Sequence, residues 1–107
     1  MKLVIAIVSN DDASACLSSL TKNSFQVTKL ATTGGFLSAG NTTLLVGCQE
    51  ELVDQCIRII GDESKRRTEV VPSTASYDIG RFASFPVEVQ VGGATIFVLD
   101  IEQYKKL

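Results

Sequence analysis

The order of the apolar segments constrains the fold of this chain more than any other feature. Short runs rich in β-branched residues, which are typical of strands, alternate with stretches whose apolar residues recur at helical spacing. Strands are predicted at residues 3–8, 25–31, 42–48, 67–71, 87–91 and 94–99. Helices are predicted at residues 11–23 and 49–63, with a short terminal helix over 100–106. The chain therefore begins with the order strand, helix, strand, strand, helix, strand.

This order is that of the ferredoxin-like βαββαβ sandwich. The last two predicted strands flank Gly92 and Gly93, a dipeptide typical of a two-residue β-turn. The sequence thus predicts an α+β fold of the ferredoxin-like type with an additional C-terminal hairpin strand. Two helices can cover only one face of the sheet, yet residues 44–46 and 96–99 are apolar on both faces. A homo-oligomer with closed rotational symmetry is the simplest way to cover the second face.

Composition limits the possible functions. With 107 residues, the chain forms a single domain, residues 1–107. Its net charge of −2 gives no general attraction to nucleic acids or anionic lipids. The apolar run at residues 3–8 is too short for a secretory signal or a membrane span. Three cysteines without C-x-x-C spacing indicate buried thiols in a reducing compartment. We therefore expect a cytoplasmic protein without membrane insertion or a nucleic-acid partner.

No catalytic set or metal site is predicted. The chain has no histidine, which removes the commonest general base and metal ligand. The acidic pair Asp11 and Asp12 is more typical of a helix start than of a cation site. The basic run at residues 65–67 is expected to be the solvated end of the second helix. The sequence therefore favours a binding protein over an enzyme.

The loop ATTGGFLSAGNTT, residues 31–43, is the best candidate for a ligand site. Gly34 and Gly35 allow backbone N–H groups to approach an anion, and the hydroxyl and amide side chains add neutral donors for a phosphate. Phe36 and Leu37 could pack against a flat base. A flexible connection, or packing of Phe36 onto a neighbouring subunit, would explain the same residues. The ligand reading predicts a molecule with both phosphates and bases.

Three stretches carry a resemblance to a known family. VTKLATTGGFLSAGNTT at residues 27–43, the opening MKLVIAIV, and FPVEVQVGGATIFVL at residues 85–99 closely resemble the bacterial PII-like cyclic di-AMP receptor family (DarA/PstA). The similarity covers nearly the whole chain. It implies a cytosolic, non-enzymatic homotrimer for signal transduction, with one cyclic di-AMP in each cleft between subunits. Ligand binding would rearrange loops that an unidentified downstream protein reads.

The resemblance also implies which residues bind the nucleotide. These are Thr28, Gly35, Phe36, Leu37, Asn41, Gly47, Gly92 and Phe97. No cofactor or metal is implied besides the ligand itself.

The chain departs from the family pattern at several positions. Ser24 and Gln26 replace an asparagine and an arginine of familiar members, and Lys106 replaces a glutamine. The loop STASYDIGRFAS at residues 73–84 is also altered and about two residues shorter. Two alternatives therefore stay open: a PII-like sensor of ATP, ADP or AMP, and a protein-binding trimer that has lost ligand binding.

Overall fold

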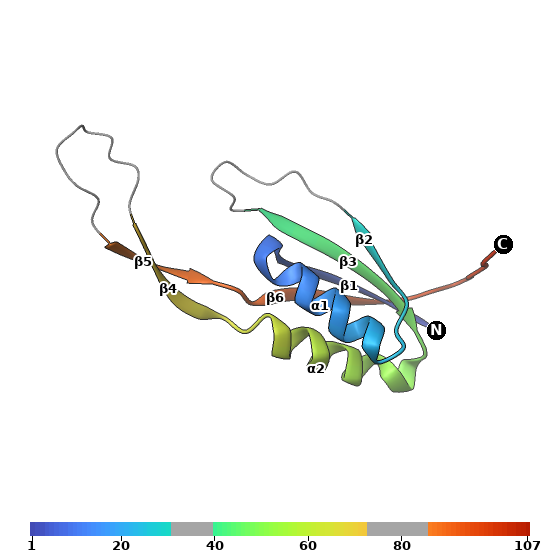
Figure 1. The fold of residues 1–107 in the computed structure, drawn as a ribbon. Helices are drawn as coiled ribbons and strands as arrows, with labels where there is room; N and C mark the ends of the chain where they lie inside the picture. Colours follow the sequence, from blue (N-terminus) through green and yellow to red (C-terminus); the bar gives the residue numbers. More distant parts are fainter. Residues whose placement is uncertain (31–39, 73–85) are drawn as a thin grey trace.

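The computed structural model describes residues 1–30, 40–72 and 86–107 of the chain (Figure 1). Its strands are β1 (Lys2–Ser9), β2 (Val27–Leu30), β3 (Asn41–Cys48), β4 (Arg67–Pro72), β5 (Pro86–Val91) and β6 (Ala94–Asp100). Its helices are α1 (Asn10–Lys22) and α2 (Val53–Glu63), and the 3-10 turn η2 (Glu50–Leu52) leads into α2. Both long helices were predicted, because their apolar residues recur at helical spacing.

Four strands form an antiparallel sheet in the order β2-β3-β1-β6, with both helices on one face (Figure 1). Val4 on β1 lies opposite Val46 on β3, and these positions are fully buried beneath the helices. Their sequence neighbours Leu3 and Ile5 point to the other face and are half-buried. A sheet of this kind with two helices is compatible with the predicted ferredoxin-like fold.

The core lies between the sheet and the helices. Cys16 and Leu20 from α1 meet Cys56 and Ile60 from α2, and each pair is spaced four residues apart on the inner face of its helix. The prediction of buried, unpaired thiols is confirmed, since all three cysteines are free and buried. Burial raises the pKa of the Cys16 thiol to about 11 and that of Cys56 to about 12. These thiols are therefore protonated packing groups at neutral pH.

The predicted hairpin of residues 87–99 is wrong. β5 pairs instead with β4 in a separate two-stranded sheet, here called the ribbon, in which Thr68 lies opposite Gln90. β6 pairs with β1, placing Phe97 opposite Ile5. Gly92 and Gly93 adopt φ angles of 87° and 86°, which suit a two-residue hairpin turn but here bend the chain from the ribbon into the main sheet. The local glycine signal identifies the bend and not the strand partner.

The predicted terminal helix and the predicted role of residues 65–67 are also wrong. β6 continues to Asp100, whose side chain pairs with Lys2, and the Ile101 amide donates to the Met1 carbonyl at 3.1 Å. Residues 101–107 form no helix. A seven-residue helix without a packed face is marginal in water, whereas the extended chain gains pairing with β1. Arg67 is the first residue of β4 and not part of the solvated end of α2.

Helix α1 ends in a left-handed residue that is not glycine. Ser24 has a φ of 70°, and the following Phe25 amide donates to the Leu20 carbonyl at 2.9 Å. Because a left-handed conformation costs a non-glycine residue roughly 1–2 kcal/mol, Ser24→Gly should stabilise the protein by up to about 1 kcal/mol in urea unfolding. The control Ser18→Gly, on the exposed middle of α1, should instead destabilise it by about 0.5 kcal/mol. Equal losses in both variants would contradict this reading of the helix end.

Candidate functional site

The sheet face opposite the helices is largely apolar and uncovered by any described element. Besides Ser9, the N-cap of α1, strand register places twelve residues on this face, here called the open face: Leu3, Ile5, Ile7, Thr28, Leu30, Asn41, Thr43, Leu45, Gly47, Thr95, Phe97 and Leu99. Phe97 is 52% exposed, and Leu30 and Leu99 are exposed to a similar extent. An apolar surface of this kind on a folded chain usually marks an interaction site.

Four predicted ligand residues lie on the open face. Thr28, Asn41, Gly47 and Phe97 come from three different strands, yet all point away from the helices. Their common placement follows from the period-two alternation of side chains along each strand. A ligand contact for these residues stays a prediction, but all four residues lie on the same surface.

Two of these residues stand at opposite ends of a single row across the sheet. Thr28 lies opposite Leu45, Leu45 opposite Ile5, and Ile5 opposite Phe97. Thr28 is therefore at the β2 edge and Phe97 at the β6 edge, separated by three strand spacings of about 4.8 Å, or roughly 14 Å. The two apolar side chains between them offer no hydrogen-bonding group to a phosphate. Within one chain, Thr28 and Phe97 do not form a compact polar pocket.

Asn41 stands where the glycine-rich loop enters β3. Its side chain is exposed, and its backbone pairs with Ser9 at the end of β1. The neighbouring residues are tied to the start of α1: the Asn10 amide donates to the Gly40 carbonyl at 3.0 Å, and the Thr42 hydroxyl donates to Asn10 Oδ1 at 2.5 Å. The residues on both sides of Asn41 are thus anchored to the start of α1, while the Asn41 side chain is exposed.

The packing of the described chain does not require a glycine at position 47. A Cβ atom there would lie 3.9 Å from Ile101 Cδ1, which is an ordinary van der Waals distance. Glycine at such a position is consistent with close approach of another molecule to the strand backbone.

Gly92 lies elsewhere, at the foot of the ribbon. A Cβ atom there would overlap the Lys65 carbonyl oxygen and lie 2.7 Å from Arg67 Nη1. The positive φ and this crowding give Gly92 a packing role that is independent of any ligand. Its predicted ligand contact stays a prediction.

The remaining predicted residues divide into two groups. Gly35, Phe36 and Leu37 lie outside the described residues. Ser24 and Gln26 are exposed just before β2 and therefore belong to the same edge as Thr28, while Lys106 is exposed in the segment after β6. The two substitutions in the family pattern at 24 and 26 thus fall next to one candidate contact.

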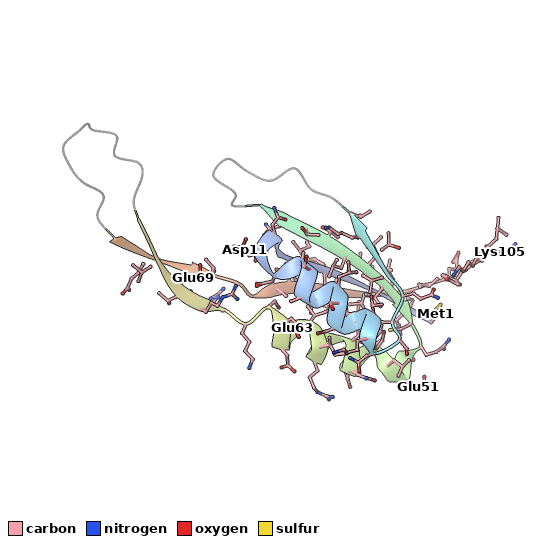
Figure 2. The ribbon with its side chains drawn as sticks, viewed as in Figure 1. Met1, Asp11, Glu51, Glu63, Glu69 and Lys105 are labelled. Carbon is pink, nitrogen blue, oxygen red and sulfur yellow. The ribbon has the colours of Figure 1, made fainter. Side chains whose placement is uncertain are left out.

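The sequence did not predict an ion pair between the start of α1 and the start of β4. Asp12, in the first turn of α1, accepts from Arg67 at the start of β4, with Nη2 to Oδ1 at 2.8 Å and Nη1 to Oδ2 at 3.4 Å. The hydrogen bond that Arg67 donates to the Asp12 carboxylate raises the pKa of the Arg67 guanidinium above its ordinary value. Figure 2 shows the adjacent Asp11 at the end of α1 that faces the ribbon, with Glu69 on β4 beyond it. The acidic helix start and the basic run were visible in the sequence, but nothing local indicated that they meet.

No helix among the residues that the structure describes is long and apolar enough to cross a membrane.

The antiparallel sheet with both helices on one face is compatible with a ferredoxin-like protein, and its other face is exposed and largely apolar. The cyclic-di-AMP receptor family matches residues 1–107, and the chain belongs to this family of receptors, which is not a family of enzymes. The predicted family is therefore confirmed. The chain is also similar to the crystal structure of a functionally unknown protein from Pediococcus pentosaceus ATCC 25745, with 40% identity, a TM-score of 0.75, and coverage of 99% of this chain and 96% of that chain.

Proposed function

We propose that the protein is a non-enzymatic, cytoplasmic receptor that binds cyclic di-AMP in the clefts between subunits of a homotrimer. Binding rearranges the loops, and a downstream protein reads the change. Membership of the cyclic-di-AMP receptor family supports the ligand. The uncovered apolar face of the sheet supports assembly, because burying it between subunits removes it from water.

One observation supports a site between subunits. It is the row of residues across the sheet formed by Thr28, Leu45, Ile5 and Phe97. Its two candidate contacts stand at opposite edges of the sheet, too far apart for one compact pocket in a single chain. When the β2 edge of one subunit approaches the β6 edge of the next, Thr28 and Phe97 become neighbours. Asn41 begins β3, next to β2, and so belongs to the β2 side of this cleft. We assign Gly35 to the same cleft.

The chemistry of the cleft suits a cyclic dinucleotide. Backbone N–H groups at Gly35 and the Asn41 amide donate to the phosphates, and Phe36 packs against an adenine. All of these donors are neutral, which agrees with a chain that has no general attraction for nucleic acids.

A second candidate is a PII-like sensor of ATP, ADP or AMP. Gln26 is exposed next to Thr28 and replaces an arginine that can stack on adenine in familiar members. Losing a cation over an aromatic ring costs roughly 0.5–2 kcal/mol, or up to about thirtyfold in affinity. A loss of this size would weaken cyclic di-AMP binding and leave another adenine nucleotide as the better ligand. A trimer that binds only protein is the remaining alternative.

A thermal-shift panel of cyclic di-AMP, cyclic di-GMP, ATP, ADP and AMP separates these functions. Cyclic di-AMP at 100 times its dissociation constant should add about 2.7 kcal/mol to the free energy of unfolding, which is readily detected as a rise in Tm. No rise with cyclic di-AMP up to millimolar concentration would overturn the proposal. A rise with ATP alone favours the second candidate, and no rise with any nucleotide favours the protein-binding trimer.

Variants in the same assay test the placement of the site. Asn41→Ala and Phe36→Ala should reduce the cyclic di-AMP shift while light scattering still finds the assembled oligomer. Gln49→Ala, an exposed amide at the opposite end of β3, is the matched control and should leave the shift unchanged. Dissociation of the oligomer by Phe36→Ala would instead indicate that Phe36 packs on a neighbouring subunit.

A further inference from the structure

The ribbon formed by β4 and β5 stands away from the main sheet (Figure 1). The two strands make extensive contact with each other and little contact with the described elements of the core. The chain enters the ribbon through residues 65 and 66 and leaves it through Gly92 and Gly93. Two short connections of this kind, one of them a pair of glycines, join the ribbon to the core, and the Gly93 amide donates to the Ser64 carbonyl between them. Connections of this length can act as a hinge, so side-chain contacts help to set the direction of the ribbon.

Among the residues that the structure describes, one side-chain ion pair joins the ribbon to the core. The Arg67 guanidinium donates to both carboxylate oxygens of Asp12, and its Nη1 also donates to the Lys65 carbonyl at 3.0 Å. A bidentate guanidinium–carboxylate pair fixes orientation as well as distance. The same guanidinium therefore holds both the connection into the ribbon and the core.

The partner carboxylate is itself firmly placed. The Asp12 side chain is 7% exposed and accepts from the Ser9 hydroxyl at 3.1 Å. A buried carboxylate has little water available to replace a lost cationic partner, so the ion pair is strongly preferred over an open state. Two residues earlier on the same turn, Asn10 forms hydrogen bonds with the Gly40 carbonyl and the Thr42 hydroxyl.

We propose that the Asp12–Arg67 ion pair is a latch that fixes the direction of the ribbon relative to the main sheet. The first turn of α1 then serves as a common anchor, because it holds the ribbon through Asp12 and the start of β3 through Asn10. The direction of the ribbon decides where exposed side chains such as Val70 and Glu88 meet another protein. The latch is independent of which ligand the protein binds.

Spin-label distances test the latch in the full-length protein. Labels are attached to cysteines introduced at Gln90 on β5 and Ser18 on α1, both of which are exposed. The three native thiols are buried, and a labelled wild-type sample checks that they stay unmodified. Diluting labelled chains into unlabelled protein leaves the distance within one chain dominant in any oligomer.

Wild type and the control Arg66→Met should give the same narrow distance distribution, since Arg66 is an exposed neighbour with the same charge. Arg67→Met and Asp12→Asn should broaden or shift this distribution, because the ribbon is then free to turn at its two connections. Circular dichroism verifies that each variant is folded. Arg67→Lys keeps the positive charge but cannot make the bidentate contact with the carboxylate. Its distance distribution should therefore have an intermediate width, and this variant tests the proposal even if Arg67→Met does not fold. A distribution identical to wild type in Arg67→Lys and Asp12→Asn would overturn the latch.

Discussion

Replacing Gly92 with alanine should lower the free energy of unfolding by about 1–3 kcal/mol, which is the usual cost of one strained backbone position. The φ of 87° disfavours any side chain, and the new Cβ would also overlap the Lys65 carbonyl oxygen. Relief requires the connection between α2 and β4 to move, because the overlapping atom belongs to the backbone. Urea unfolding followed by circular dichroism measures the loss.

Gly61 provides the matched control for this change. It lies in α2, and a Cβ added there would meet nothing within 4 Å. Since alanine favours a helix over glycine, Gly61→Ala should raise the free energy of unfolding by about 0.5–1 kcal/mol. If Gly92→Ala matched the wild type in stability, the described bend between β5 and β6 would be contradicted.

Leu45→Asp should convert the proposed trimer into monomers. Leu45 lies near the middle of the open face, between Thr28 and Ile5 in the strand register. Burying an unpaired carboxylate between subunits costs several kcal/mol, which corresponds to a weakening of assembly by roughly 10²- to 10⁴-fold per interface. Light scattering or sedimentation measures the mass in solution, and circular dichroism checks that the monomer keeps its fold.

Ser18→Asp introduces the same charge on the exposed outer surface of α1 and should leave the oligomer intact. A wild-type protein that is already monomeric would overturn the proposed assembly. A Leu45→Asp variant that keeps the wild-type mass would place the subunit interface elsewhere on the molecule.

The sequence predicted the elements better than their pairing. Both helices and the strands β1 and β3 follow from local periodicity, because each buries one face against a neighbouring layer. β4 follows from its β-branched residues, although it lies in the exposed ribbon. The partner of β6 did not follow, because the Gly92–Gly93 signal is local while the match between β6 and β1 joins residues more than 80 positions apart. The terminal helix failed for the same reason, since pairing of Lys2 with Asp100 outweighs a weak local helix preference.

The candidate site shows the same division. Alternation along β3 places Asn41 and Gly47 on one face, and this needs only the sequence and a correct strand assignment. That Thr28 and Phe97 share this face depends on the register between strands. The separation of Thr28 from Phe97 depends on the strand order β2-β3-β1-β6, which no local pattern encodes. The Asp12–Arg67 pair likewise joins residues 55 positions apart.

The strand order also restricts the symmetry of any assembly that completes the site. A two-fold axis brings identical edges together, so it would place Thr28 beside Thr28 and Phe97 beside Phe97. Joining a β2 edge to a β6 edge requires a head-to-tail, heterologous interface, which forms a ring when the rotation between subunits closes. Each cleft in the proposed trimer is then built from two different subunits. A subunit altered only at Thr28 and one altered only at Phe97 can therefore form an unaltered cleft together, on one side of their contact.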